Sequence, residues 1–198
     1  QINLGKGTLE SLERELLPVA LGNPQKSVYR RLLVEVYGAM TFPLVHAARL
    51  GHGQAATSAR QALATIGARA VKPLLDALAD PKDAQQRVAI EVLAYVQNKG
   101  AGPALFNFAL GQADRDLRVR AMVACGALGD PDLLVRYEQL LAPDASEGVA
   151  VGDAIAVAAA WGVARMGSKN AEPLLRRLLD SSSPDIRALA AIGLGLSG

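Results

Sequence analysis

Apolar residues recur along this chain at helical spacing, in short runs separated by polar turn residues. In the clearest run, positions 71, 74, 75 and 78 are apolar, and this spacing places them on one face of an α-helix. A polar turn at 80–83 follows, in which Pro81 comes directly after the capping residue Asp80. A second helix is predicted over 84–96. The same order of helix, turn, helix and turn recurs along the chain, and no segment alternates as a strand does.

The pattern predicts six such helix pairs and therefore an all-α fold. The expected pairs are 8–21 with 27–40, 43–50 with 55–66, 70–79 with 84–96, 103–110 with 117–128, 132–141 with 149–166, and 171–179 with 184–194. The fifth pair has a long polar connection at 142–148, which makes this unit longer than the others.

Proline marks the start of several of these units. Pro43, Pro73 and Pro103 lie 30 residues apart, and two apolar residues follow each of them. The same phrase returns at Pro173, after the longer fifth unit. A repeat of this length indicates stacked supersecondary units that share a core along one axis. We therefore expect residues 1–198 to form a single solenoid domain.

The composition agrees with closely packed helices and points to no highly charged partner. Hydrophobic residues make up 51% of the chain but aromatic residues only 4%, so Ala, Leu and Val dominate. Alanine favours helices and lets neighbouring helix axes approach. The 21 basic and 19 acidic residues nearly balance, so composition alone does not favour a polyanion.

Residues that carry chemistry are few. Cys125 is the single cysteine and lies in an apolar helical stretch, so we expect a buried residue rather than a reactive thiol. His46 and His52 lack the partners of a zinc site. The acidic residues near the long connection, Asp144, Glu147 and Asp153, are expected to be solvated. We therefore predict a protein that is not an enzyme and holds no metal or cofactor.

The chain offers no segment for crossing a membrane. Its longest apolar run, Ala154–Ala164, is well short of the ~20 residues that span a bilayer. No signal peptide opens the chain, which begins at Gln1. We expect a soluble protein, whose compartment the sequence does not identify.

The repeated phrases resemble HEAT repeats, in particular the bacterial kind known as phycobilisome-lyase (PBS lyase) HEAT-like repeats. The last unit carries the resemblance best, through Pro173-Leu174-Leu175, Asp180, Ile186-Arg187 and Leu194-Gly195. The resemblance implies a right-handed α-solenoid with first helices on a convex face and second helices on a concave one. It also implies a ladder between neighbouring repeats, formed by turn aspartates and second-helix arginines. The matching residues are Asp80, Asp180, Arg120 and Arg187.

The function that these features favour is a scaffold or adaptor that binds another protein through the concave face. The candidate contact residues lie on the second helices outside the buried positions: Arg31, Glu35, Gln61, Arg87, Glu91, Tyr95 and Arg118. Arginine and tyrosine are common at the centres of protein interfaces.

Two other functions stay open. The family name suggests a partner-dependent lyase or isomerase subunit of the phycobilin type, although no thiol or acid–base pair for that chemistry is evident. Nucleic-acid binding would use the basic clusters Arg30-Arg31, Arg115/Arg118/Arg120 and Arg176-Arg177. Glu35 and Glu91 partly neutralise the concave face, and Trp161 has apolar neighbours that suggest packing, so nucleic acid is disfavoured.

The last residues suggest an open end. Residues 190–198 carry no charged side chain, whereas solenoids normally end in polar capping repeats. The chain is therefore expected to be a segment of a longer repeat protein, or to associate end to end with another copy.

Overall fold

The computed structural model describes residues 6–23, 26–80, 85–111, 114–142 and 153–197. These residues are almost entirely helical and contain no strand. The chain divides into two compact units, Gln1–Ala101 (unit 1) and Gly102–Gly198 (unit 2). Whether the two units stack as one continuous solenoid stays a prediction.

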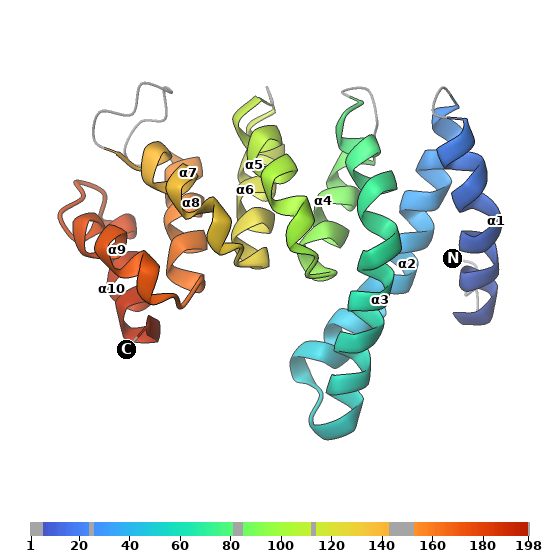
Figure 1. Ribbon diagram of the computed structural model, residues 1–198, viewed down its shortest axis with the longest axis horizontal. Coiled ribbons are helices and arrows are strands. Elements are labelled where there is room, and N and C mark those ends of the chain that lie inside the picture. The colour runs from blue at the N-terminus through green and yellow to red at the C-terminus, as the bar shows by residue number, and fades with distance from the viewer. Residues whose placement is uncertain (1–5, 24–25, 81–84, 112–113, 143–152, 198) are drawn as a thin grey trace. The chain divides into compact units, whose positions relative to one another are not determined.

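Unit 1 is built from four α-helices and one short 3₁₀ turn. These are α1 (Lys6–Gly22), α2 (Ser27–Leu50), α3 (Gly53–Leu78), α4 (Gln86–Tyr95) and η1 (Lys99–Ala101). Helix α1 packs on α2 and α3, and α2 packs on both α3 and α4 (Figure 1). First helices α1 and α3 and second helices α2 and α4 thus form two layers.

Unit 2 contains three helix pairs. Its elements are α5 (Gly102–Gly111), α6 (Arg115–Leu128), η2 (Pro131–Leu133), α7 (Leu134–Leu140), α8 (Ala154–Arg165), η3 (Lys169–Ala171), α9 (Glu172–Leu178) and α10 (Pro184–Ser197). Each first helix packs on the second helix that follows it, and α8 also packs on α6 and α10. The second helices α6, α8 and α10 therefore form a continuous row.

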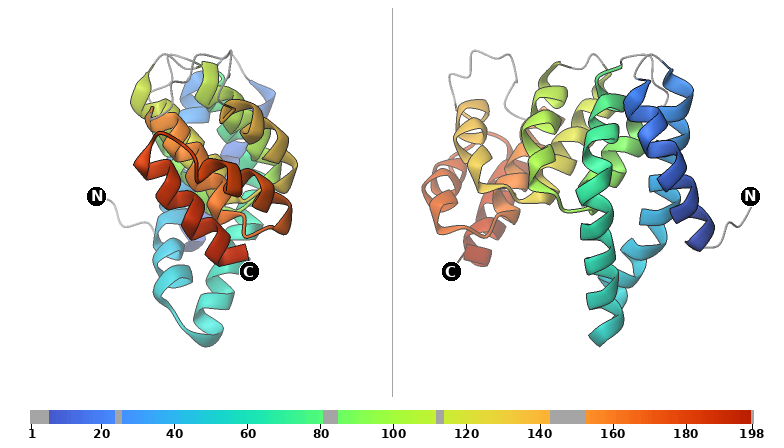
Figure 2. Two further views of the ribbon diagram at one scale, coloured as in Figure 1. Left: turned by 90° about the vertical axis from the view of Figure 1, so that its left-hand side faces the viewer. Right: turned by 45° about the vertical axis from the view of Figure 1, so that its right-hand side comes forward.

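The prediction of six separate pairs is wrong at the second pair. The expected helices 27–40 and 43–50 are one helix, α2, of 24 residues, and the expected helices 55–66 and 70–79 are one helix, α3, of 26 residues. The described residues therefore contain ten α-helices in five pairs. The two long helices run side by side to a common tip at Gly51-His52 (Figure 2).

Helices α2 and α3 both continue through an internal proline. A proline inside a helix deprives the carbonyl four residues earlier of its partner. For Pro43 and Pro73 these carbonyls belong to Ala39 and Arg69, which are both exposed. Water can bond to such carbonyls, so the helix continues through the proline.

Gly67 marks a close helix contact rather than the end of a helix. It lies inside α3 and is buried. A Cβ at this position would lie 2.8 Å from the carbonyl oxygen of Val96, and the Asn98 amide donates a hydrogen bond to the Gly67 oxygen at 3.3 Å. Glycine is therefore needed here because the end of α4 approaches the α3 backbone.

One turn recurs where a second helix leads into the next first helix. Gln97, Gly129 and Gly167 have positive φ angles of 53°, 59° and 54°. The residue after each of them, Asn98, Asp130 or Ser168, accepts a hydrogen bond from the backbone N–H two positions further on. The 3₁₀ turns η1, η2 and η3 follow. This shared turn gives the second helices a common register.

The core confirms the predicted burial of Cys125, which is 1% exposed. Its thiol donates to the Gly102 carbonyl at 3.6 Å and accepts from the Tyr137 hydroxyl at 3.3 Å. Burial raises the pKa of the Cys125 thiol to about 11, so the thiolate is rare at neutral pH.

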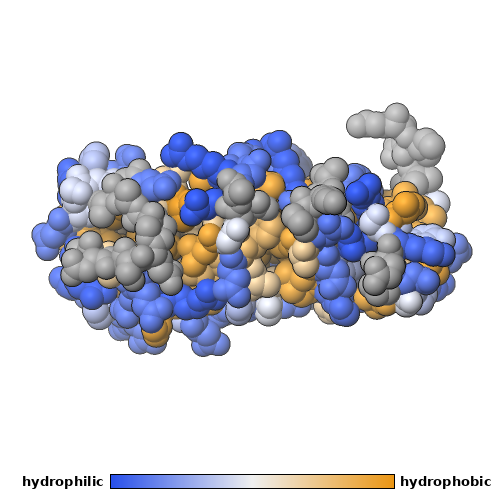
Figure 3. Space-filling view, turned by 90° about the horizontal axis from the view of Figure 1, so that it is seen from above, coloured by the Kyte–Doolittle hydropathy of each residue, from blue (hydrophilic) through white to orange (hydrophobic). Residues whose placement is uncertain are grey.

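Some apolar side chains reach the surface between polar ones (Figure 3). Among the described helices, none is long and apolar enough to cross a membrane.

Candidate interaction surface on the second helices

The shared turn shows which residues of α4, α6 and α8 face outward. Counted back from the positive-φ residue, the positions 10, 6 and 2 places earlier are four residues apart and so share one helix face. They are Arg87, Glu91 and Tyr95 in α4, Val119, Val123 and Ala127 in α6, and Val157, Trp161 and Arg165 in α8. All of them are exposed or half-exposed, whereas the positions just after the middle residue of each set are buried.

The outward residues of α4 are among those predicted to contact a partner, and that role stays a prediction. Arg87 and Glu91 form an exposed ion pair at 3.5 Å. Tyr95 meets Phe42 of α2 edge-on, with ring centroids 6.4 Å apart. The Arg49 guanidinium lies 5.1 Å from the centre of the Tyr95 ring. The polar face of unit 1 therefore contains an aromatic pair covered by a cation.

Helix α2 contributes a mixed face beside α4, on which it packs. Glu35 is exposed as predicted, together with Val28 at 62% and Leu32 at 49% exposure. Arg31 is only half-exposed. Gln61 is exposed, but it lies on α3, in the layer of first helices, so its assignment to the second-helix face is wrong.

Arg118 was predicted as a partner contact, but its side chain makes a hydrogen bond within the chain. Its Nε donates to the carbonyl oxygen of Ala109 at 3.0 Å, near the end of α5. Gln86 does the same to Leu78 and Asp80, and Arg187 to Ser181 and Ser182. A side chain from the start of each of these second helices thus satisfies carbonyls at the end of the preceding first helix or in the turn that follows it.

The residues that the family resemblance assigns to a ladder make the following contacts with other described residues. The Arg120 Nε lies 2.6 Å from a carboxylate oxygen of Asp116, one turn earlier in the same helix. Asp80 pairs with Arg30 of α2, also at 2.6 Å. Arg187 bonds the two turn carbonyls described above rather than an aspartate of a neighbouring repeat.

In unit 2 the outward face is mainly apolar. We call the six residues Val119, Val123, Ala127, Val157, Trp161 and Arg165 the α6–α8 stripe. Val123 is 39% exposed. Helices α6 and α8 meet closely beneath the stripe, because a Cβ at Gly126 would lie 2.5 Å from the Cα of Gly162.

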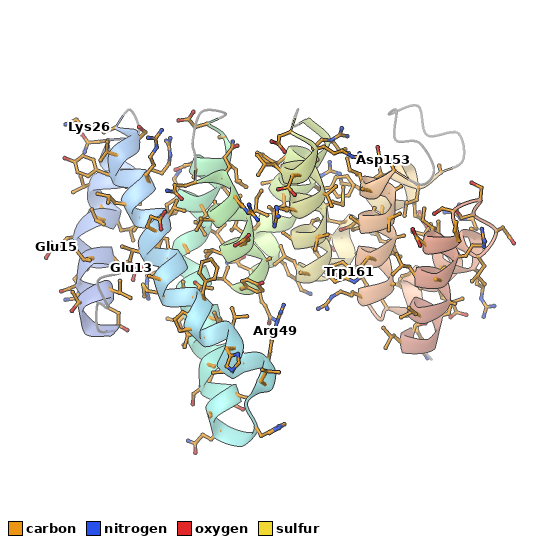
Figure 4. All side chains as sticks on the ribbon, turned by 180° about the vertical axis from the view of Figure 1, so that it is seen from behind. Glu13, Glu15, Lys26, Arg49, Asp153 and Trp161 are labelled. Carbon is orange, nitrogen blue, oxygen red and sulfur yellow. The ribbon has the colours of Figure 1, made fainter. Side chains whose placement is uncertain are left out.

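Trp161 is half-exposed and does not have the purely internal packing role predicted for it. One edge of its ring lies against Gly126. The Arg165 guanidinium, one turn later, lies 4.9 Å from the centre of the ring. Figure 4 shows Trp161 partway along α8, with Asp153 at the other end of that helix. Tryptophan and arginine are both enriched at binding hot spots, and here a cation–π contact joins them.

The basic clusters considered for nucleic acid are paired within the chain. Arg30 pairs with Asp80, Arg115 with Asp153 at 3.8 Å, Arg176 with Glu172 at 2.6 Å and Arg177 with Glu138 at 3.7 Å. Intramolecular carboxylates reduce the charge that these arginines present to phosphates.

The residues considered for metal binding and catalysis lie apart. No group of three or more His, Cys, Asp or Glu side chains comes together in the part of the chain that the structure describes. His46 and His52 are exposed. Asp153 caps α8 through the Ile155 N–H at 3.3 Å, while Asp144 and Glu147 lie outside the described residues.

Unit 2 also contains a cavity of about 280 Å³ beside α9. Its walls are mostly apolar, from Leu140, Ala156, Leu174 and Ile186, and Arg177 and Asp180 add polar groups. Cys125 does not line this cavity, because it is buried elsewhere in the unit.

The α6–α8 stripe was missed from sequence although a signal for it existed. Val123 and Trp161 both lie six residues before a glycine that ends a second helix, Gly129 or Gly167. Alignment on these glycines would have placed both residues level with Glu91. When the second helices are instead aligned on their first residues, several of which are arginines, Arg118 is selected in place of Val123.

Comparison with known proteins agrees with this architecture. No curated protein matches the chain. The family model of the PBS lyase HEAT-like repeat matches residues 155–181, which include nearly all of α8, then η3 and α9. The match thus begins in one second helix and ends after the next first helix. This helical chain therefore carries a HEAT-like repeat of the PBS lyase type.

Proposed function

We propose that this chain is a non-catalytic scaffold that binds another protein through the α6–α8 stripe. The observation that carries the proposal is the exposed, mainly apolar stripe with Trp161 stacked on Arg165. As part of the same proposal, the helix pairs stack in a right-handed superhelix whose second helices line the concave side, as in other HEAT-like repeats.

The partner that fits the stripe is an amphipathic helix with apolar side chains along one face and a carboxylate at its edge. Apolar side chains would cover Val123 and Trp161, and complete burial of a valine-sized side chain contributes about 1.5 kcal/mol or more. The carboxylate would face Arg165, which stacks on a ring. The helix would run between α6 and α8, as apolar helices lie in hydrophobic grooves.

The alternatives have less support. A phycobilin-type lyase or isomerase subunit would need a group for pigment chemistry, and the thiol of this chain is buried with a raised pKa. Nucleic-acid binding would need free basic groups, and the arginine clusters above are paired with carboxylates. Both remain as outcomes of the experiment.

The experiment starts with proteins captured by the chain and by a Val123→Glu/Arg165→Glu variant, after nuclease treatment. Each candidate partner is then purified and titrated into the chain. Trp161 is the single tryptophan, so its fluorescence should shift to the blue when a partner covers the stripe. The variant should bind at least ten-fold more weakly, which is about 1.4 kcal/mol.

Val135→Glu/Arg60→Glu is the matched control, because it makes the same two changes at an exposed valine of α7 and an exposed arginine of α3, both outside the stripe. It should leave the affinity unchanged. Equal binding by the Val123→Glu/Arg165→Glu variant and the original chain would refute the proposal. Loss of the captured material on nuclease treatment would favour nucleic acid, and pigment transfer to an apo-phycobiliprotein would favour the lyase alternative.

A further inference from the structure

The cavity of unit 2 is separate from the proposed partner site. It lies where the first helices α7 and α9 end and the second helices α8 and α10 begin, among helices that pack on one another (Figure 1). Its volume is about 280 Å³. None of the described residues that line it belongs to the α6–α8 stripe.

The floor of this cavity consists of core side chains. It is lined by Leu140, Ala156, Leu174, Leu178 and Ile186, each of which is at most 6% exposed. Packed protein interiors contain few spaces larger than a water molecule, and an apolar cavity of about 150 Å³ is large enough to bind benzene. The space above these side chains can therefore hold an apolar body of about two fused rings.

Small residues hold α8 and α10 together at a distance from the cavity. A Cβ at Gly193 of α10 would lie 2.8 Å from the Cα of Ala164 of α8. These two residues follow the cavity residues Ile186 and Ala156 by seven and eight positions, which is about two helical turns. The tight contact therefore does not close the space at the start of the two helices.

Polar residues border the opening of the cavity. They are Arg177, Asp180, Ser181 and Ser182, which are exposed or half-exposed. An apolar floor with a few polar groups beside it is the usual composition of a small-molecule site, because the apolar walls supply affinity and the polar groups orient the ligand.

The two charged residues at the opening differ in their contacts. Arg177 is shared with Glu138, whose Oε1 lies 3.7 Å from its Nη2. Asp180 is the turn aspartate that the family resemblance assigns to a ladder, yet its carboxylate forms no ion pair with any described residue. Arg187 donates instead to two carbonyls of the same turn, at 2.7 and 3.0 Å. The charge that remains for a ligand is therefore negative.

We propose that this cavity binds a small apolar amine, whose apolar body covers the core side chains and whose ammonium group lies beside Asp180. Removal of the apolar body from water supplies most of the affinity. The ion pair adds little, because the Asp180 carboxylate is exposed to water. A ligand with a carboxylate in the same place is repelled, so Asp180 selects the sign of the ligand's charge.

Three ligands with the same two-ring body test this selection. They are naphthylmethylamine, naphthylmethanol and naphthoate, which carry a cation, a neutral hydroxyl and an anion at neutral pH. Each is titrated into the chain while the methyl signals of Leu140, Leu174 and Ile186 are followed by NMR. The amine should bind most tightly, with a dissociation constant on the order of 0.1–1 mM, and the anion most weakly.

Two variants test the floor and the charge separately. Ala156→Leu should weaken all binding by roughly ten-fold or more, because the added side chain occupies the space of the ligand. Its control is Ala64→Leu, at an exposed position of α3. Asp180→Asn should weaken the amine by about three-fold and leave the alcohol unchanged. Its control is Asp185→Asn, which neutralises an exposed carboxylate at the start of α10. Circular dichroism should show the same helix content in all four variants.

The outcome is independent of the proposed partner site. Val123→Glu/Arg165→Glu should bind the amine as the original chain does, so either proposal can fail alone. No saturable binding of any of the three ligands, tighter binding of the anion than of the amine, or unchanged affinity in a folded Ala156→Leu variant would overturn the assignment of this cavity.

Discussion

Replacement of Glu13 by alanine should weaken the attachment of α1 to the rest of unit 1. The Glu13 carboxylate is 4% exposed and accepts hydrogen bonds from Arg69 Nε at 2.7 Å, Arg69 Nη2 at 2.9 Å and the Tyr37 hydroxyl at 3.1 Å. One side chain of α1 thus binds α2 and α3 together. Glu13→Ala leaves both partners without this acceptor.

The magnitude follows from the burial of the two partners. Tyr37 is fully buried, and a buried hydroxyl that loses its acceptor costs about 1–3 kcal/mol. The Arg69 side chain is 42% exposed, so water can replace much of the hydrogen bonding that it loses with Glu13. The loss of roughly 3–5 kcal/mol that is typical of a broken buried ion pair is therefore too high for this pair. We expect a loss of about 2–3 kcal/mol in the free energy of unfolding of unit 1.

Urea unfolding followed by circular dichroism measures this loss, and hydrogen exchange locates it. Amide protons of α1 should exchange faster in Glu13→Ala. Glu15→Ala is the matched control, since it removes an exposed carboxylate from the same helix (Figure 4) and should cost less than about 0.5 kcal/mol. Equal effects of the two variants, or no coupling between Glu13→Ala and Arg69→Ala in a double-mutant cycle, would refute the reasoning.

Three further predictions concern stability. Pro43→Ala should stabilise unit 1 by about 1–3 kcal/mol in urea unfolding, because it restores a hydrogen bond inside the continuous helix α2; no gain would mean that α2 ends near Pro43. Gln97→Gly should raise the melting temperature and the free energy of unfolding, the latter by about 1 kcal/mol, because Gln97 has a φ of 53° that glycine adopts without strain. The control Gln139→Gly, at an exposed position inside α7, should destabilise the protein. Burial raises the pKa of Tyr37 and of Tyr137 above the ordinary 10.0, so stability should be retained below pH 10 and fall as the pH rises further. Tyr37→Phe should reduce the slope of unfolding free energy against pH above pH 10. An unchanged slope would contradict the burial of the Tyr37 hydroxyl.

Local signals in the sequence determined most of the helices of unit 2. The predicted helices 103–110, 117–128 and 184–194 correspond to α5, α6 and α10, with differences of at most three residues at their ends. Here the hydrophobic period coincides with capping residues, because Asp114 caps the start of α6 and Gly129 follows its end. Where periodicity and caps agree, local chemistry is sufficient to define a helix.

The break signals of unit 1 were misleading because their effect depends on three-dimensional surroundings. The cost of Pro43 inside a helix depends on whether water can reach the carbonyl that it frees, and Ala39, which carries that carbonyl, is exposed. Gly67 has the composition of a helix end, but it is required by the approach of Val96 from α4. Neither solvent exposure nor that approach can be read from neighbours in sequence.

The sequence by itself determined an all-helical repeat protein, the burial of Cys125 and the outward position of Arg87, Glu91 and Tyr95. Tertiary structure alone decided which arginine caps a helix and which stacks on a ring. Arg118 reaches the Ala109 carbonyl, whereas Arg165 covers Trp161. The physical reason is that helical periodicity gives the direction of a side chain, but its partner depends on the adjacent helix, and packing between helices sets that distance.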